Sequence, residues 1–325
     1  MQQRPLGRTG HDVSTIGLGT WQLGADWGDV SDADALAVLD AAAASGVTVF
    51  DTADVYGDGR SESTIGRWLA GNPGTPMTVL TKMGRRLPEQ LHAGYSAEHF
   101  RAWTDRSRAN LGVDTLDLVQ LHCPPASVIH DDAVFEALDA LVADGAIGAY
   151  GVSVETADEA LAAIARPGVQ SVQIILNAFR LKPLDAVLPA AIEAQTAIIA
   201  RVPLASGLLS GRYTETTAFA ADDHRNYNRD GSAFDVGETF SGVDYATGVA
   251  AAREFVELAA DAVPGATPAQ VALAWVAAQP GVTTVIPGAR TPEQAQANAA
   301  AGGVILPSGF DDAVRALYDR RFRAA

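Results

Sequence analysis

The chain has 325 residues, of which 48% are hydrophobic and 19% are charged, so it is long enough to enclose a large core. Its formal net charge of −16 argues against nucleic acid or an anionic membrane as a partner. Cys123 is the only cysteine, no apolar run reaches the roughly 18 residues of a membrane span, and residues 1–5 lack a signal-peptide core, so we expect a cytoplasmic protein.

A short leading hairpin is predicted from residues 4–16, with its turn at Thr9-Gly10. A strand near 16–19 and a helix over 33–44, closed by Gly46, come next, and strands then alternate with helices. The strands are predicted at 47–50, 77–82, 116–122, 147–153, 170–176, 197–202 and 283–287. The helices are predicted at 61–70 (with Ser61 as N-cap), 96–110, 132–144, 156–165, 185–195, 249–262 continuing at 268–279, 291–301 and 309–323.

The alternation gives about eight strand–helix units, which implies parallel pairing. Eight such units in a chain of this length predict a single (β/α)₈ TIM-barrel domain over residues 1–325. A doubly wound sheet is the alternative. It is disfavoured because Gly17-Leu18-Gly19 does not continue into G-x-G-x-x-G. Residues 212–245, after the seventh strand, lack clear periodicity, and a long loop of this kind is more often a functional lid than a packing element.

Four ionisable residues follow the ends of predicted strands. Asp51, Lys82 and His122 each end a strand, and Tyr56 lies on the loop after Asp51. Because the strand ends of a barrel converge on one face, we expect the four side chains to meet there. The lysine would lower the pKa of the tyrosine, the aspartate would keep the lysine charged, and the histidine would hydrogen-bond a substrate oxygen. Each residue alone has an ordinary structural interpretation; together they predict a catalytic site.

The other histidines are predicted to lie on the surface: His11, His92, His99, His130 and His224. Cys123 has no cysteine or histidine partner at metal-ligand spacing, so no metal site is expected.

Residues 283–301 predict an anion site. A strand and a Pro-Gly turn are followed by Thr291 as a helix N-cap, and the amino end of a helix favours phosphate. Arg290 adds a planar fork suited to a phosphomonoester, and Gln294 and Asn298 lie four residues apart on one helical face. An ordinary capped helix is the alternative for this segment.

From about residue 4 to residue 301 the chain resembles the aldo-keto reductase family. The shared motifs are R-P-L-G-R-T-G at 4–10, G-L-G-T-W at 17–21, D-T-A-D-V-Y-G at 51–57, T-K at 81–82, D-L-V-Q-L-H at 117–122, G-V-S at 151–153, P-L-A-S-G-L-L-S-G-R-Y at 203–213 and I-P-G-A-R at 286–290. The family fold is a (β/α)₈ barrel, in agreement with the prediction above.

The resemblance implies a role for each matching position. Tyr56 would be the general acid or base, Lys82 the modifier of its pKa, Asp51 the partner of Lys82, and His122 the group that polarises the carbonyl. The implied NADP-binding residues are Thr20, Trp21, Ser153, Gln173, Pro203, Leu204, Ser206, Arg212, Gly288, Arg290, Gln294 and Asn298. Val154 departs from the family, which often has Asn or Arg there, so one hydrogen bond to the nicotinamide carboxamide is missing at that position.

These observations predict an NADP(H)-dependent oxidoreductase that reduces small aldehydes or ketones, sugars among them, to alcohols. Two alternatives remain open at this point. The enzyme could instead oxidise sugars or alcohols with NAD(P)⁺, or the chain could be a non-catalytic subunit that senses the cofactor, as the ion-channel β-subunits resembling this family are. The sequence identifies neither the substrate nor the oligomeric state.

Overall fold

Eight parallel strands form the centre of the molecule. The computed structural model describes residues 1–24 and 30–323, and in it the strands pair in chain order from the first to the eighth. They are β3 (Leu18–Gly19), β4 (Val49–Asp51), β5 (Thr78–Met83), β6 (Leu118–His122), β7 (Tyr150–Ser153), β8 (Val169–Ile175), β9 (Ala197–Arg201) and β10 (Val282–Val285). Their residues are almost all buried, as expected of a parallel sheet covered on both faces. All eight predicted strands are therefore present.

The first and last strands meet and close the sheet into a barrel. Parallel bridges join Ile16 to Val285 and Gly19 to Gly288. The amide of Gly19 donates to the carbonyl of Pro287 at 3.0 Å. A Cβ at Gly19 would lie 2.9 Å from the carbonyl oxygen of Ile286, so glycine permits this close approach. The predicted (β/α)₈ barrel is confirmed, and a doubly wound sheet is excluded.

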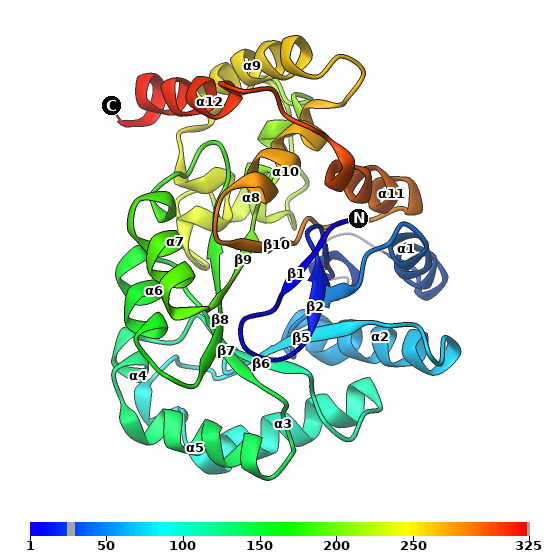
Figure 1. Ribbon diagram of the computed structural model, residues 1–325, viewed down its shortest axis with the longest axis vertical. Helices are drawn as coiled ribbons and strands as arrows, with labels where there is room; N and C mark the ends of the chain where they lie inside the picture. The colour runs from blue at the N-terminus through cyan, green and yellow to red at the C-terminus, as the bar shows by residue number, and fades with distance from the viewer. Residues whose placement is uncertain (25–29, 324–325) are drawn as a thin grey trace.

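Helices surround the strands on the outside (Figure 1). They are α1 (Asp32–Ala44), α2 (Arg60–Gly71), α3 (Ala97–Leu111), α4 (Ala126–Ile129), α5 (Asp132–Ala143), α6 (Ala157–Ile164), α7 (Pro183–Ala194), α9 (Tyr245–Ala262), α10 (Pro268–Ala278), α11 (Pro292–Ala300) and α12 (Phe310–Tyr318). Side-chain caps start several of them; Thr156 and Glu159, for example, form a capping box at α6. Helix α11 packs against α1, so the helical ring closes as the sheet does.

The leading hairpin covers one mouth of the barrel. Strands β1 (Gln3–Pro5) and β2 (Asp12–Ser14) pair antiparallel, as predicted. Leu6 and Val13 from this hairpin are fully buried in one apolar cluster with barrel residues such as Leu80 and Leu118. The hairpin therefore fills the amino-terminal mouth, which leaves the carboxyl-terminal mouth for a ligand.

A long connection follows β9 and contains only short helical turns. These are η4 (Ala205–Ser210), α8 (His224–Tyr227), η5 (Val236–Glu238) and η6 (Phe240–Gly242), and α9 begins at Tyr245. Ser206 Oγ donates to the carbonyl of Glu238 at 2.8 Å, and Asn177 Nδ2 donates to Ser241 Oγ at 2.7 Å. We call residues 212–245 the covering segment; these bonds tie it to the loops at the carboxyl-terminal mouth. Among the described residues, no helix has both the length and the apolar character that crossing a membrane requires.

Candidate active site

A tight turn carries Tyr56 away from the end of β4. The amide of Asp54 donates to the carbonyl of Lys82 at 3.1 Å, and residues Tyr56–Gly59 form the 3-10 turn η2. The next helix, α2, begins at Arg60, and its N-cap is Gly59 rather than the predicted Ser61. Ser61 is instead buried inside the first turn, where its Oγ donates to Thr20 Oγ1 at 2.8 Å. The hydroxyl thus joins the helix to the end of β3 instead of capping it.

Asp51 and Lys82 form a buried ion pair at neighbouring strand ends. The ammonium of Lys82 lies 2.5 Å from Asp51 Oδ1 and also donates to the carbonyl of Thr52 at 2.8 Å. The second carboxylate oxygen of Asp51 accepts hydrogen bonds from Gln173 at 2.7 Å and Gln120 at 3.4 Å. Burial lowers the pKa of Lys82, but the charges of Asp51 and Tyr56 outweigh it, so the pKa is raised. The lysine therefore stays charged inside the barrel.

Tyr56 and His122 face each other above this pair. Their ring centroids are 6.0 Å apart, and the ammonium of Lys82 lies 5.3 Å from the centroid of the Tyr56 ring. Burial raises the pKa of Tyr56; Lys82 lowers it in part, as predicted, but does not offset burial, so the predicted net lowering is wrong. Burial and nearby cations, Arg85 foremost, hold the pKa of His122 well below its ordinary value. The site therefore has a protonated phenol beside a neutral imidazole.

These residues open into a cavity of about 920 Å³ at the carboxyl-terminal mouth. That volume is at the upper end of the range for small-molecule sites. All of the sequence-predicted site residues line it except Lys82 and Ser153. Those that do are Thr20, Trp21, Asp51, Tyr56, His122, Gln173, Pro203, Leu204, Ser206, Arg212, Gly288, Arg290, Gln294 and Asn298. Residues on or after six different strands, β3, β4, β6, β8, β9 and β10, thus meet in one space.

One end of the cavity lies at the start of α11. Thr291 caps this helix as predicted, accepting from the amide of Gln294 at 3.3 Å. Gln294 Oε1 accepts from the amide of Arg290 at 2.8 Å, and Asn298 Nδ2 donates to the carbonyl of Gly288 at 3.1 Å. Both side chains thereby fold the strand-to-helix turn around the helix start. The result is an arginine and a helix amino end facing the same space, which suits an anion.

Ser153 and Gln173 pair across the neighbouring strands β7 and β8, and Gln173 lines the cavity. Ser153 is buried, with its Oγ 3.6 Å from Cys123 Sγ, and Gln173 donates its amide to Asp51. Val154 is buried and offers no donor of its own, but its carbonyl accepts from Arg201 Nη2 at 3.0 Å. A guanidinium from the end of β9 therefore occupies the neighbourhood where the sequence lacks a polar side chain.

Several residues of the cavity were missed by the sequence analysis. Arg85, Arg201 and Glu238 line it, and Arg201 and Glu238 form an ion pair. The prediction for His224 is wrong: this side chain is 4% exposed, lines the cavity and lies 5.3 Å from the ring of Trp21. Burial lowers the pKa of His224 to about 4. The four other histidines are exposed as predicted.

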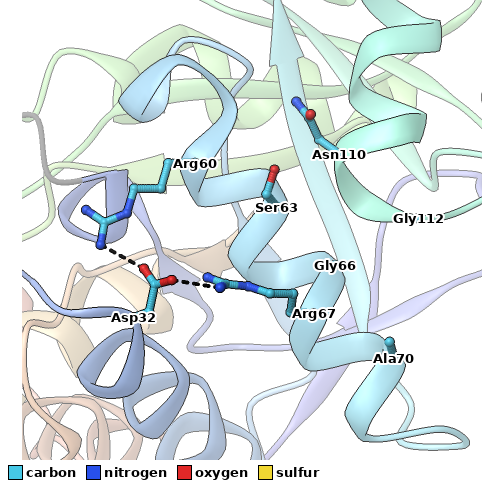
Figure 2. Close-up of a pocket in the computed structure, with 8 residues that line it drawn as sticks. All are labelled: Asp32, Arg60, Ser63, Gly66, Arg67, Ala70, Asn110 and Gly112. Atoms are coloured by element: carbon cyan, nitrogen blue, oxygen red, sulfur yellow. Dashed lines mark hydrogen bonds and ion pairs between the residues drawn. The ribbon is translucent and has the colours of Figure 1, made fainter.

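A second, shallower hollow lies on the outside of the barrel, lined by residues of α1, α2 and α3 (Figure 2). Its two cations, Arg60 and Arg67, both turn toward Asp32, at 2.9 and 2.7 Å. Because that carboxylate occupies both guanidinium groups, the hollow does not offer an anion site. The described part of the chain also contains no cluster of side chains arranged to bind a metal ion.

The chain is similar to known proteins over nearly its whole length. A family model described as the Aldo/keto reductase family matches residues 15–318. An uncharacterized oxidoreductase of Mycobacterium tuberculosis is 33% identical over 309 residues, covering 93% of this chain and 88% of that relative. Aldo-keto reductase yakc [NADP(+)] of Schizosaccharomyces pombe is 29% identical over 323 residues, covering 97% and 92%. The structure of glycerol dehydrogenase AKR11B4 from Gluconobacter oxydans superposes with a TM-score of 0.78 at 28% identity, covering 96% of this chain and 94% of that one.

Proposed function

Because the chain belongs to the aldo/keto reductase family, we propose that it is an NADP(H)-dependent reductase of aldehydes and ketones in which Tyr56 is the general acid. The arrangement of Tyr56, Lys82, Asp51 and His122 at the base of the large cavity carries this proposal. Burying an ion pair has a large desolvation cost in folding free energy. The presence of such a pair beneath a phenol therefore points to a catalytic role rather than to stability.

The residues of the cavity fit a dinucleotide with an additional phosphate. Arg290 and the amino end of α11 would hold the adenosine end and its 2′-phosphate, with Gln294 and Asn298 beside them. The loop after β9, from Pro203 to Arg212, would lie over the pyrophosphate. The Schizosaccharomyces pombe relative is named for NADP(+), which supports this choice of cofactor.

Reduced nicotinamide would supply the hydride for the carbonyl carbon. As the carbonyl oxygen gains negative charge, the phenol of Tyr56 donates its proton to it. The ammonium of Lys82, held by Asp51 and Thr52, stabilises the phenolate that remains. His122 is neutral because burial and nearby cations lower its pKa, so it donates a hydrogen bond to the same oxygen without adding a charge.

The direction of the Tyr56 pKa favours reduction. Burial raises it, so the phenol carries its proton throughout the neutral range and is ready to donate it. The reverse reaction needs the phenolate as a base, which forms only at higher pH. We therefore expect reduction to be independent of pH near neutrality and alcohol oxidation to increase as the pH rises.

The decisive variant is Tyr56→Phe, measured by the loss of absorbance of NADPH with a broad panel of aldehydes. We expect kcat to fall by about 10²- to 10⁴-fold, the usual contribution of a positioned acid, while the Kd for NADPH stays unchanged. The wild-type enzyme should also use NADPH in clear preference to NADH.

Tyr150→Phe is the matched control. The phenol of Tyr150 donates to Asp139 at 2.7 Å and lies at the first residue of β7, away from the carboxyl-terminal mouth. Its loss should leave kcat unchanged. If Tyr56→Phe keeps the wild-type kcat, the assignment of the acid is wrong.

A further inference from the structure

Arg85 is a cation in the cavity that has no anionic partner among the described residues. It follows β5 by two residues, lines the cavity and is partly buried. Within residues 1–24 and 30–323 its guanidinium forms no ion pair and no hydrogen bond. Its Cζ lies 5.9 Å from the centroid of the Phe234 ring. An arginine that is partly removed from water and left without an acceptor is suited to bind an anionic ligand.

The next residue, Arg86, shows that an arginine on this loop can reach a carboxylate. Arg86 extends to Asp58, whose Oδ1 lies 2.6 Å from its Nη2. The other cavity arginines with known partners are also neutralised, since Arg201 pairs with Glu238 and Arg225 with Asp223. Glu155 is near enough to Arg85 for the arginine's charge to affect its pKa, but no ion pair forms between them.

The position of Arg85 separates it from the proposed phosphate-binding residues. Those residues follow β9 and β10, whereas Arg85 follows β5, which is three strands away from β10 around the barrel. The charge of Arg85 adds to burial in lowering the pKa of His122. The ring centroids of Phe234 and Trp21 are 6.0 Å apart, and Trp21 stacks on Tyr56 at 6.1 Å between centroids. Arg85 therefore belongs to the end of the cavity where the carbonyl group reacts.

We propose that Arg85 binds an anionic group on the substrate, so that the preferred substrates are aldehydes or ketones carrying a carboxylate or a phosphate. The inference rests on the proposed reductase function and specifies its substrate class. Trp21 and Phe234 would cover the carbon chain between the reacting carbonyl and the anion. The guanidinium would hold the anion through charge-assisted hydrogen bonds, leaving the chemistry to Tyr56 and His122.

The test compares charged and neutral substrates of similar shape. One pair is 4-oxobutanoate and its methyl ester; the other is glyceraldehyde 3-phosphate and glyceraldehyde. We expect the wild-type kcat/KM to be about 10- to 100-fold higher for the charged member of at least one pair, the effect of one or two hydrogen bonds to a charged group. The pair that shows the preference identifies carboxylate or phosphate as the group bound.

The preference should disappear in Arg85→Gln, because the KM for the charged substrate rises toward that for its neutral counterpart. Arg85→Lys should restore part of it, which shows that the loop remains folded. Arg86→Gln is the matched control and should keep the full preference, because Arg106 still holds Asp58 at 3.0 Å.

Turnover of both members of each pair without a charge preference, or a preference that survives in Arg85→Gln, would overturn the inference and leave the reductase proposal intact. Absence of turnover with every charged and neutral substrate would overturn the reductase proposal, and the inference with it.

Discussion

Asp54 lies three residues after Asp51 in the same turn, but the two carboxyl groups have opposite surroundings. Asp51 is neutralised by an ion pair, whereas Asp54 is 1% exposed and its Oδ1 has no hydrogen-bond partner among the described residues. Burial, reinforced by the nearby charge of Glu62, raises the pKa of Asp54 to about 7 against the opposing effect of two arginines. The folded protein therefore keeps a proton on Asp54 that the unfolded chain releases near pH 4.

This difference predicts how stability depends on pH. Between about pH 4 and pH 7 the folded state binds one proton more at Asp54 than the unfolded state, so the free energy of unfolding falls as the pH rises. The fall is about 1.4 kcal/mol per pH unit, or about 4 kcal/mol over the interval. Asp54→Asn removes this contribution and should make the protein more stable than wild type at pH 8. Urea unfolding across this range measures both effects.

Asp12→Asn, at an exposed residue of β2, serves as the control and should leave the wild-type pH dependence in place. Parallel curves for wild type and Asp54→Asn would show that Asp54 does not hold the extra proton.

Strand ends explain which residues of the site could be predicted. Asp51, Lys82 and His122 are placed by regular secondary structure, because parallel strands in a barrel must bring their carboxyl ends together. Arg85 lies on the loop after β5, and His224 lies in the short helix α8 of the covering segment. The paths of both segments depend on contacts that local sequence does not encode. His224 is buried only because the covering segment folds back onto Trp21. The direction of the Tyr56 pKa shift could not be predicted from the sequence either, because it depends on how deeply the phenol is buried.

Helices and strands were predictable because their ends carry local chemistry. Thr291 and the capping box of Thr156 fix helix starts through hydrogen bonds within one turn. The prediction failed at Ser61, where the hydroxyl group bonds to Thr20 from another element. A residue that suits a cap is thus used for a contact between elements, which a single stretch of sequence does not reveal.

Gly57, in the turn that carries Tyr56, occupies a position where a residue with a side chain does not fit. Its φ is +59°, and a Cβ there would lie 2.1 Å from the carbonyl oxygen of Gly24. Gly57→Ala should therefore cost more than the roughly 1–2 kcal/mol of the left-handed conformation alone, and should lower kcat by displacing Tyr56. Urea unfolding and steady-state kinetics on the same preparation measure the two effects.

Gly74→Ala separates the clash from the backbone conformation. Gly74 also has a positive φ, +84°, but a Cβ there meets nothing within 4 Å. This variant should lose only the conformational contribution and keep full activity. Equal losses of stability and activity in the two variants would show that the clash with the Gly24 carbonyl contributes nothing to the effect of Gly57→Ala.

The barrel as a whole was predictable from the sequence, whereas the path of the covering segment was not. Eight strand–helix repeats leave few topologies that bury every strand. The covering segment has no such repeat, and its contacts with the barrel come from scattered residues such as Ser206 and Asn177. The cavity carries the opposite charge to the chain as a whole. Among its described lining residues, the cavity of a chain with net charge −16 has five arginines and two acids: Arg85, Arg201, Arg212, Arg225 and Arg290 against Asp51 and Glu238.

The ion pair of Arg201 and Glu238 joins the barrel to its cover. Arg201 is the last residue of β9, Glu238 lies in η5 of the covering segment, and their side chains are only 8% and 14% exposed. Burial lowers the pKa of Arg201, but Glu238 outweighs it and the pKa is raised. The buried charge of Arg201 is therefore compensated by a residue of the covering segment, and the segment depends on Arg201 for part of its attachment.

Removing one partner should cost more than removing both. Glu238→Gln leaves the Arg201 charge buried without its counter-ion, and we expect the free energy of unfolding to fall by about 3 kcal/mol. The double variant Arg201→Gln, Glu238→Gln should recover part of this loss because no uncompensated charge remains. Trypsin should also cleave the covering segment faster in Glu238→Gln than in wild type, since the segment has lost its anchor. A double variant that loses the sum of the two single effects would show that the two residues act independently and that other contacts hold the cover to the barrel.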